Sequence, residues 1–260
     1  MEVVIVADRD EAGRLVAGAV AALVACRPAP VLGLATGGSP LSVYRELAGQ
    51  VAAGRVSLAR ARAFLLDEYV GLPPEHPQAY RAFIARELEA HVDFAPGAVQ
   101  GPAADAADIP AACAAYEEAI RAAGGVDLQL MGIGSDGHIG FNEPGSSLAS
   151  RTRIKTLTDQ TRRDNARFFR TLDEVPRHVV TQGIGTILEA HHLVLLAFGP
   201  AKAQAVAQAV EGPVTAMVPA SALQLHPHVT VVVDEDAASR LRLAGYYRET
   251  FAHKPRWQGL

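Results

Sequence analysis

Short apolar runs that alternate with longer, alanine-rich amphipathic segments are the feature that most constrains the fold of this chain. Apolar runs of this length, separated by helical segments, are typical of βαβ units with parallel strands buried on both faces. The expected strands are Val3–Ala7, Val31–Ala35, Ala63–Leu66, Val126–Met131, Leu193–Phe198 and Val229–Val233. The expected helices are Asp10–Cys26, Pro40–Ala53, Gln78–His91, Ala111–Ala123, Thr161–Arg170, Pro200–Val210 and Glu235–Tyr246. The pattern predicts an open, mainly parallel, Rossmann-like α/β sheet with helices on both faces.

The length and composition of the chain fit one such domain. The chain has 260 residues, of which 49% are hydrophobic, and this is enough to bury a large core. We therefore expect residues 1–260 to form a single domain, with the segment Ala95–Pro110 as a surface excursion within it. The formal net charge of −4 provides no general basic field, which argues against nucleic-acid binding.

The sequence carries no pattern that suggests export or a membrane partner. No apolar run approaches the length that spans a bilayer, and the first residues read as a strand rather than a signal peptide. The two cysteines, Cys26 and Cys113, lie far apart and lack metal-ligand spacing, so we expect free thiols in a reducing compartment. The expected localisation is cytoplasmic.

The densest group of chemically useful side chains lies between Gly132 and Pro144. Asp136, His138 and Glu143 follow an apolar run, and the glycines among them let the backbone turn sharply near a ligand. A catalytic histidine needs a neighbour that fixes its tautomer and balances its charge, and carboxylates serve both purposes. The alternative is a glycine-rich turn with a solvated aspartate and a structural histidine. The flanking strand and the Asn-Glu-Pro continuation favour the functional interpretation.

Two further groups follow expected strands, at the sheet edge where open α/β proteins bind ligands. The turn Thr36–Pro40, with Ser39 as the expected N-cap of a helix, exposes N–H groups that suit an anion. An ordinary strand–turn–helix is an equal alternative for this turn. Asp67 and Glu68 follow the next strand, and Asp67 is the stronger candidate for a base. Glu68 reads rather as a helix cap or a solvated carboxylate.

Cations that could hold a phosphate are scattered along the second half of the chain. The segment Ser146–Lys155 mixes three cations with hydroxyls, a combination that binds phosphate but more often forms a solvated loop. Arg167 and Lys202 lie on expected helices, and each taken alone reads as a surface charge. The pair His191 and His192 lacks an acidic partner at metal-ligand spacing and is interpreted as structural.

Together these motifs resemble the glucosamine-6-phosphate deaminase family, the isomerase-deaminases of amino-sugar catabolism. The motifs that carry the resemblance are Thr36–Pro40, Leu66–Leu72, Gly134–Pro144 and Ser146–Thr156. The resemblance is collinear over nearly the whole chain. It departs from the family at Gly140, where alanine is usual, at Ser39, where threonine is usual, and in the tail after Arg248.

The resemblance implies conversion of D-glucosamine 6-phosphate and water to D-fructose 6-phosphate and ammonia, with no metal or organic cofactor. It implies that His138 opens the sugar ring while Asp136 and Glu143 orient its imidazole. It also implies that Asp67 moves a proton from C2 to C1 of the open chain. The residues that would bind the phosphate are Gly37, Gly38, Ser39, Arg167 and Lys202. Arg167 lies on a segment, residues 157–178, that resembles the family's mobile lid.

The resemblance further implies a regulated homo-oligomer. Some bacterial members of the family are hexamers that N-acetylglucosamine 6-phosphate activates by binding at a subunit interface. The residues that match this activator site are Ser147, Arg153, Lys155 and, more weakly, Tyr246. We therefore expect a cooperative homohexamer.

Two other functions remain open at this point. One is a lactone hydrolase similar to 6-phosphogluconolactonase, which shares the Gly-x-Asp-Gly-His segment but has no need of Asp67 as a carbon base. The other is a non-catalytic sugar-phosphate sensor. The Phe-Asn-Glu-Pro and Asp-Glu-Tyr-Val-Gly-Leu segments, both present here, favour the deaminase over the lactone hydrolase.

Overall fold

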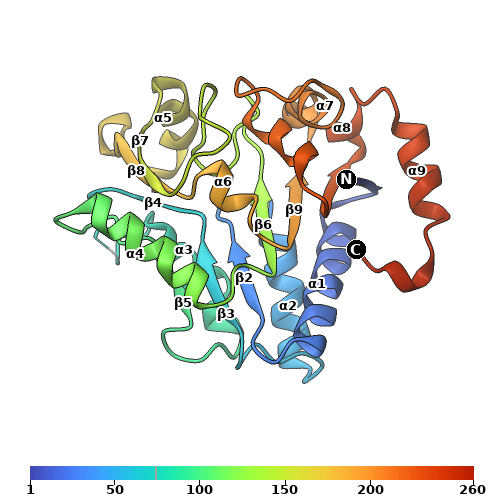
Figure 1. The fold of residues 1–260 in the computed structure, drawn as a ribbon, viewed down its shortest axis with the longest axis horizontal. Helices are drawn as coiled ribbons and strands as arrows, with labels where there is room; N and C mark the ends of the chain where they lie inside the picture. Colours follow the sequence, from blue (N-terminus) through green and yellow to red (C-terminus); the bar gives the residue numbers. More distant parts are fainter. Residues whose placement is uncertain (74) are drawn as a thin grey trace.

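The computed structural model describes residues 1–73 and 75–260, and within them it contains a seven-stranded sheet that is parallel throughout. In spatial order the strands are β1 (Glu2–Val6), β10 (Val229–Asp234), β9 (His192–Ala197), β6 (Leu128–Gly132), β2 (Val31–Leu34), β3 (Arg62–Leu65) and β5 (Val99–Gln100). Every expected strand is present, with its ends displaced by no more than two residues, and β5 is additional. The predicted α/β fold with a mainly parallel sheet is therefore confirmed (Figure 1).

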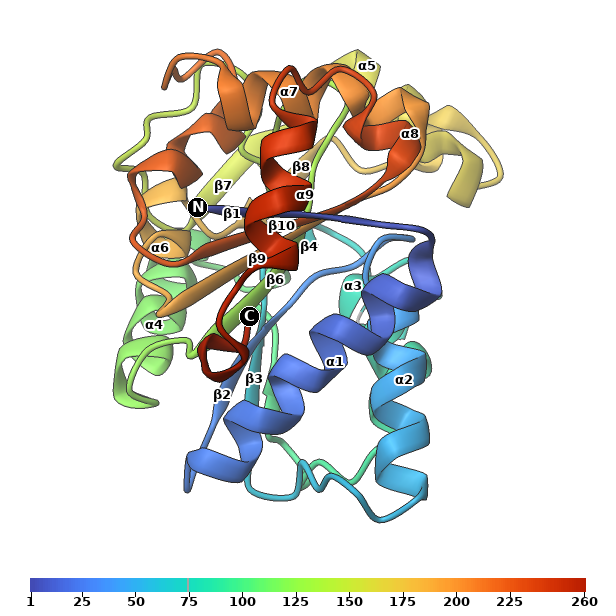
Figure 2. The ribbon, with the colours of Figure 1, turned by 90° about the vertical axis from the view of Figure 1, so that its right-hand side faces the viewer.

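Helices cover both faces of this sheet. Alternate residues of each strand point to opposite faces, and each face packs against its helices in a separate hydrophobic core. On β9, Leu193 and Leu195 belong to one core, whereas Val194 and Leu196 belong to the other. The core of Val194 is covered by α1 (Arg9–Cys26), α2 (Leu41–Ala52) and α3 (Tyr80–Glu87) (Figure 2). The core of Leu193 is covered by α4 (Ile109–Ala122), α6 (Ile184–Ile187), α7 (Ala203–Glu211) and α8 (Glu235–Ala238). Among the described residues, no helix combines the length and apolar character that crossing a bilayer requires.

A second, antiparallel sheet was not predicted from the sequence. Its strands are β4 (Asp67–Tyr69), β8 (His178–Thr181) and β7 (Arg153–Thr156), in the order β4-β8-β7. These strands are three or four residues long, and β7 alternates half-buried with exposed positions, so their apolar signal is weak. Asp67 was expected in the loop after β3, but it opens β4 and pairs with Thr181 of β8.

The expected helix Glu235–Tyr246 is instead two helices, α8 and α9 (Ala244–Ala252). The carboxylate of Glu211, at the end of α7, accepts hydrogen bonds from the backbone N–H groups of Arg242 and Leu243, both at 2.9 Å. These N–H groups would otherwise continue the helix. A tertiary contact therefore overrides the local helical preference at this point.

Other helix predictions need correction at their starts or ends. The expected helix Gln78–His91 is α3, which ends at Glu87 and is followed by the 3-10 helix Glu89–His91. The expected helix Pro200–Val210 begins as the 3-10 helix Pro200–Lys202 before α7. The expected helix Thr161–Arg170 is α5 (Asp159–Asn165), followed by the short 3-10 helix Ala166–Phe168. Helix α2 begins at Leu41 and has no side-chain cap, so the expectation that Ser39 is its N-cap is wrong.

Strands β2 and β6 are neighbours at the point where the order of the chain across the sheet reverses. From β2 the chain continues to β3 and β5 on one side, and it returns on the other side as β6 and β9. In open α/β sheets, ligands bind at such a point, beyond the carboxyl ends of the strands. The turn Thr36–Pro40 leaves β2 and the Asp136–His138 segment leaves β6, so both lie at this end of the sheet.

Gly13 marks a close contact between α1 and α2, and it provides a test of the packing. A Cβ on Gly13 would lie 2.7 Å from the carbonyl oxygen of Ser42. We expect Gly13→Ala to lower the free energy of unfolding by about 1–3 kcal/mol, although alanine is the better helix former. The matched control is Gly49→Ala on α2, where an added Cβ meets nothing within 4 Å. It should raise stability by about 0.5–1 kcal/mol. Urea denaturation measures both, and equal effects of the two substitutions would contradict the tight helix contact.

Candidate active site

His138 lies on a tight turn that follows β6. The N–H of Gly134 donates to the carbonyl oxygen of His138 at 2.9 Å, and the N–H of Gly137 donates to the carbonyl oxygen of Gly134 at 3.1 Å. Gly137 has a φ of 87°, a left-handed conformation that favours glycine. A Cβ on Gly134 would lie 2.2 Å from Cε1 of the His138 ring. The two glycines therefore let the turn close and let the imidazole lie directly against the backbone.

Asp136 is the nearest charged partner of His138. Its Oδ1 lies 2.7 Å from Nδ1 of His138 and accepts a hydrogen bond from the backbone N–H of His138 at 3.1 Å. The ring nitrogen is not aligned for a regular hydrogen bond, so the contact is an ion pair only when the imidazole is protonated. The contact with His138 is the main cause of a lowered pKa of Asp136. An ionised Asp136 lies where it could stabilise a protonated imidazole, and that role stays a prediction.

Asp67 reaches the same loop from the other sheet. Its side chain is buried, and its Oδ2 lies 3.5 Å from the point where a Cβ on Gly140 would stand. Gly140 comes two residues after His138. Burial, reinforced by the negative charge of Glu68, raises the pKa of Asp67 well above its usual range. The structure thus brings the two predicted proton-transfer groups, Asp67 and His138, to one loop.

The carboxylate of Glu68, unlike that of Asp67, contacts the start of α3. Its carboxylate accepts hydrogen bonds of 2.8–2.9 Å from the backbone N–H groups of Tyr69, Tyr80 and Arg81. Tyr80 and Arg81 open α3, so Glu68 satisfies N–H groups that a helix start leaves free. Burial raises the pKa of Glu68 in spite of these hydrogen bonds. The capping interpretation of Glu68 agrees with these contacts.

Glu143 is buried beneath the start of α5. The hydroxyl of Thr161 donates to Oε1 of Glu143 at 2.5 Å, and the backbone N–H of Thr158 approaches its carboxylate at 3.3 Å. Thr158 is also the N-cap of α5. Within the described part of the chain, the hydrogen bonds of Glu143 go to α5 and not to His138. Its role as a second partner of His138 therefore stays a prediction.

The turn after β2 has the properties of an anion site. Gly37 has a φ of 85°, and none of the N–H groups of Gly37, Gly38 and Ser39 finds a hydrogen-bond acceptor among the described residues. Lys202 ends the 3-10 helix Pro200–Lys202, which follows β9. Because β9, β6 and β2 are consecutive in the sheet, the loops of Lys202 and of the glycines open at the same edge.

Arg167 is connected to the other candidate residues through a neighbouring residue, Asn165. It lies on the 3-10 helix after α5, is exposed, and its guanidinium stands 4.7 Å from the centre of the Phe168 ring. The amide of Asn165, two residues earlier, donates to the hydroxyl of Tyr69 at 3.0 Å. The segment that carries Arg167 is therefore attached to β4, whose first residue is Asp67.

An aromatic cluster that was not predicted from the sequence joins these parts. The ring of Tyr69 lies 4.9 Å from Tyr80, 5.8 Å from Phe141 and 5.8 Å from Phe169, between ring centres. Tyr69 comes two residues after Asp67, and the other rings belong to α3, the His138 loop and the segment after α5. Tyr69 and Phe141 lie inside two of the sequence motifs, and Phe169 lies two residues after Arg167. This proximity in sequence is the signal that could have identified the cluster.

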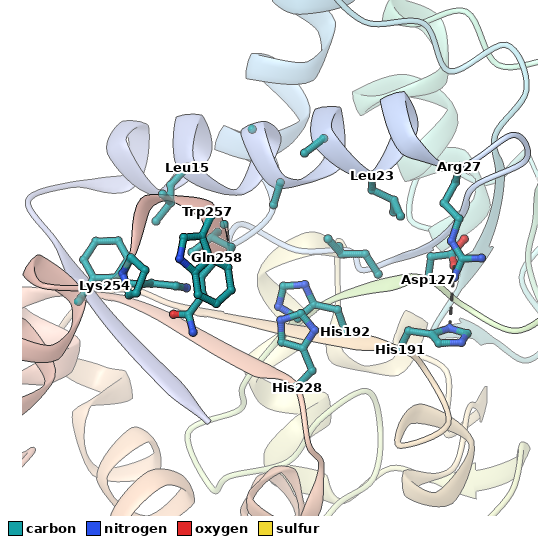
Figure 3. A pocket seen from close by; sticks show the side chains of 18 residues that line it. Leu15, Leu23, Arg27, Asp127, His191, His192, His228, Lys254, Trp257 and Gln258 are labelled. Carbon is teal, nitrogen blue, oxygen red and sulfur yellow. Dashed lines mark ion pairs between the residues drawn. The ribbon is translucent and has the colours of Figure 1, made fainter.

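A cavity of about 670 Å³ lies at the opposite end of the sheet (Figure 3). It lies between α1, the starts of β6 and β9, and the C-terminal residues. The stacked rings of His192 and His228, 3.7 Å apart, and the ion pair of Arg27 with Asp127 line it. Burial lowers the pKa of His192 to about 3, so His192 is neutral and hydrogen-bonded to Thr230. The cavity contains none of the predicted site residues, and His192 fits the structural interpretation.

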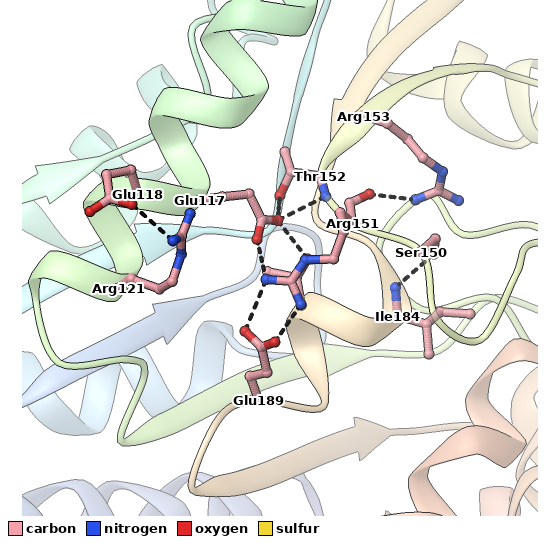
Figure 4. A network of polar contacts seen from close by, with 10 residues as sticks. Glu117, Glu118, Arg121, Ser150, Arg151, Thr152, Arg153, Ile184 and Glu189 are labelled. Carbon is pink, nitrogen blue, oxygen red and sulfur yellow. Dashed lines mark hydrogen bonds and ion pairs between the residues drawn. The ribbon is translucent and has the colours of Figure 1, made fainter.

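The segment Ser146–Lys155 is held by a buried carboxylate (Figure 4). Arg151 forms an ion pair with Glu117 of α4 and another with Glu189, the latter at 2.5 Å. Glu117 also accepts the backbone N–H of Thr152 at 2.8 Å. Although burial alone would raise it, these hydrogen bonds lower the pKa of Glu117. The charge of Arg151 is therefore paired with acids of the same chain.

The residues predicted to bind an activator are only partly brought together. Arg153 and Lys155 share one face of β7, since they are two residues apart on a strand. Ser147 is exposed on the turn before β7. Tyr246 is 59% exposed on α9, and this helix lies across the molecule from β7 (Figure 1). Within one chain, Tyr246 is thus separate from the other three.

Known proteins resemble the chain in sequence and in fold. The sequence model of the family described as glucosamine-6-phosphate isomerases/6-phosphogluconolactonase matches residues 8–232. Proteins named glucosamine-6-phosphate deaminase from Beutenbergia cavernae and Mycolicibacterium smegmatis are 66% and 64% identical to this chain, each over all of both chains.

Solved structures give the same result. The structure of a monomeric glucosamine-6-phosphate deaminase is 41% identical, has a TM-score of 0.90, and covers 92% of this chain and 100% of its own. A 6-phosphogluconolactonase from Thermotoga maritima, 21% identical, has a TM-score of 0.72 over 90% of this chain and 98% of its own, and shares the fold alone. The chain therefore belongs to the glucosamine-6-phosphate isomerase/6-phosphogluconolactonase family, and within it to the glucosamine-6-phosphate deaminases.

Proposed function

We propose that this protein, as one unit over residues 1–260, converts D-glucosamine 6-phosphate and water to D-fructose 6-phosphate and ammonia. Relatives named for this deamination are 66% and 64% identical over the whole chain. The observation that carries the proposal is the buried carboxyl of Asp67 beside the loop of His138. A base for a carbon-bound proton and an imidazole for oxygen-bound protons are the two groups that the reaction needs.

His138 opens the sugar ring in this proposal. The substrate arrives as a closed pyranose, so one proton must leave the anomeric hydroxyl and one must reach the ring oxygen. Imidazole exchanges protons near neutral pH, and the His138 side chain is 22% exposed and accessible to a sugar. Its Nδ1 faces Asp136, which leaves Nε2 for the substrate. Asp136 stabilises the imidazolium, as the acid of a catalytic triad does.

Asp67 then moves a proton between neighbouring carbons. It takes the proton from C2 of the open chain and returns it to C1, which gives a ketose imine that water hydrolyses with release of ammonia. The raised pKa of Asp67 supports this role, because a carboxylate that binds a proton more tightly is a stronger base. Its burial keeps water from the intermediate.

The phosphate binds at the turn after β2. The free N–H groups of Gly37, Gly38 and Ser39 donate hydrogen bonds to its oxygens, and Lys202 and Arg167 supply positive charge. Residues 157–178, which carry Arg167, act as a lid that closes over the substrate. Since a sugar phosphate is charged and does not leave the cytoplasm freely, we place the reaction there.

We further propose that N-acetylglucosamine 6-phosphate binds Ser147, Arg153 and Lys155, with Tyr246 of a neighbouring subunit, in a homohexamer. The ion pairs of Arg151 with Glu117 and Glu189 support this, because they fix the segment Ser146–Lys155 and so hold its other cations in place. The separation of Tyr246 from β7 within one chain fits a site that two subunits share. A monomeric deaminase 41% identical to this chain is the opposing observation.

An ammonia-release assay tests the proposed reaction. We expect purified protein to release ammonia and fructose 6-phosphate in equal amounts from D-glucosamine 6-phosphate, and to leave 6-phosphogluconolactone at its spontaneous rate of hydrolysis. Lactone hydrolysis without ammonia release would replace the deaminase with a lactone hydrolase. Binding of the amino-sugar phosphate without turnover would indicate a sensor.

Asp67→Asn tests the assignment of the base. The variant keeps the shape of the side chain but cannot take a proton, so we expect kcat to fall by about 10²–10⁴-fold. In the wild-type protein, kcat should fall on acidification at a pH above the ordinary carboxyl range, because the pKa of Asp67 is raised. Exchange of the C2 hydrogen with solvent at the wild-type rate in Asp67→Asn would refute the assignment.

The same variant should be more stable than the wild type at neutral pH. A raised pKa means that the fold loses stability as the pH rises from the unfolded-state pKa of Asp67 to its raised folded-state pKa, above which the whole penalty is present. The advantage of asparagine should therefore disappear below the unfolded-state value of about 3.9. Asp136→Asn is the matched control with the opposite sign, because the pKa of Asp136 is lowered. It should reduce stability at neutral pH and lose this effect in acid, as thermal unfolding at several pH values can measure.

Sedimentation with and without N-acetylglucosamine 6-phosphate tests the proposed assembly. We expect a particle of six times the 27.4 kDa of one chain, together with faster turnover at low substrate concentration when the activator is present. Arg153→Met should abolish the activation and leave the basal rate unchanged. A monomer whose initial rates do not respond to the activator would remove both parts of this proposal.

A further inference from the structure

Arg9 opens α1 but reaches over to the turn after β2. One N–H of its guanidinium donates to the carbonyl oxygen of Gly38 at 3.2 Å. The same guanidinium lies 4.9 Å from the centre of the Phe198 ring, at the end of β9. Gly38 belongs to the proposed phosphate turn, and Phe198 precedes the loop that carries Lys202. Arg9 therefore joins the two loops that hold the phosphate.

The contact with Gly38 fixes one peptide plane. In a trans peptide the C=O and the following N–H point in opposite directions, and the described residues contain no cis peptide. With the Gly38 carbonyl turned toward Arg9, the N–H of Ser39 must point away from α1. That N–H has no acceptor among the described residues. A flipped peptide would instead present a carbonyl oxygen on that side, where it would repel an anion.

Such a flip is easy in this turn unless something prevents it. Gly37 already has a φ of 85°, and glycine adopts both signs of φ at little cost. A Cβ on Gly37 would meet nothing within 4 Å, so packing does not hold the turn in place. The hydrogen bond from Arg9 is the contact with Gly38 that selects one orientation.

The position of Arg9 is otherwise unfavourable for a cation. The first turn of a helix is the positive end of its dipole, where a cation is unfavourable. The neighbouring acids have other partners. Asp8 accepts the N–H of Glu11 at 2.8 Å, Asp10 pairs with Arg45 at 3.6 Å, and Glu11 accepts the N–H of Ala7 at 2.7 Å. No ion pair within the described ranges, 1–73 and 75–260, includes Arg9. A role outside the helix explains an arginine here.

We propose that Arg9 is a positioning residue of the phosphate site, which holds the Gly38–Ser39 peptide with its N–H toward the substrate phosphate. The Phe198 ring restrains the guanidinium and so reduces the entropy lost when the hydrogen bond forms. The uncompensated charge of Arg9 also polarises the peptide and attracts the dianion. This inference rests on the proposed function, since it takes the ligand to be a sugar phosphate.

Arg9→Met tests the inference, because methionine keeps an apolar stem over Phe198 but donates no hydrogen bond. We expect KM for D-glucosamine 6-phosphate, and the inhibition constant of inorganic phosphate, to rise about tenfold. We expect kcat to change by less than about twofold, because the proton-transfer groups are untouched. Arg9→Lys, which keeps a charged donor, should recover part of the affinity. Arg14→Met, on an exposed position of the same helix, is the matched control and should change neither constant.

Three results would overturn the inference. The first is an Arg9→Met protein with the wild-type KM and phosphate inhibition. The second is an equal loss of affinity in Arg14→Met, and the third is no recovery of affinity in Arg9→Lys. Calorimetric titration with inorganic phosphate separates this inference from the proposed reaction. If the wild type releases no ammonia but binds phosphate in an Arg9-dependent way, the reaction fails and the role of Arg9 stands. If the wild type releases ammonia and Arg9 is irrelevant to phosphate, the reverse holds.

Discussion

Burial of the Asp67 carboxyl is the constraint on which the candidate site depends. A buried acid with a raised pKa destabilises the ionised protein, so the surrounding backbone has to be held firmly. The carbonyl oxygen of Leu65, at the end of β3, accepts hydrogen bonds from the Tyr116 hydroxyl at 2.7 Å and the Gln182 amide at 2.9 Å. These bonds fix the bend between β3 and β4. A Cβ on Gly140 would lie 2.9 Å from the hydroxyl oxygen of Thr181, so the glycine lets the His138 loop pack against β8 beside the carboxyl. The fold thus maintains a buried carboxyl of raised pKa at a stability cost.

The sequence predicted the parallel sheet well, because strands buried on both faces leave continuous apolar runs that few other elements produce. It did not predict the small antiparallel sheet, whose pairs, such as Asp67 with Thr181, join residues far apart in the chain. Without this sheet, the sequence could not explain why Asp67 and Glu68 differ. Neighbouring residues on a strand point to opposite faces. The carboxyl of Asp67 therefore lies beside Gly140, whereas that of Glu68 caps α3.

Residue types were easier to predict than their partners. The sequence placed Asp136, His138 and Glu143 in one segment, but spacing alone could not show that Glu143 bonds to Thr161 of α5. Nor could it show that Arg151, one of three clustered cations, forms an ion pair with Glu117 on α4. Side chains of this length reach several positions, and the tertiary fold decides among them.

The sheet itself sets the distance between the proposed phosphate turn and the proposed proton-transfer groups. The proposed phosphate turn follows β2, while Asp67 and His138 follow β3 and β6, the two strands that flank β2. Neighbouring strands lie about 4.7–4.9 Å apart, which is close to the width of a sugar ring. A hexose whose phosphate is fixed at β2 can therefore present its far carbons to groups from either side. Because the spacing comes from strand pairing rather than from flexible loops, orientation of the substrate is built into the part of the fold that the sequence specifies most strongly.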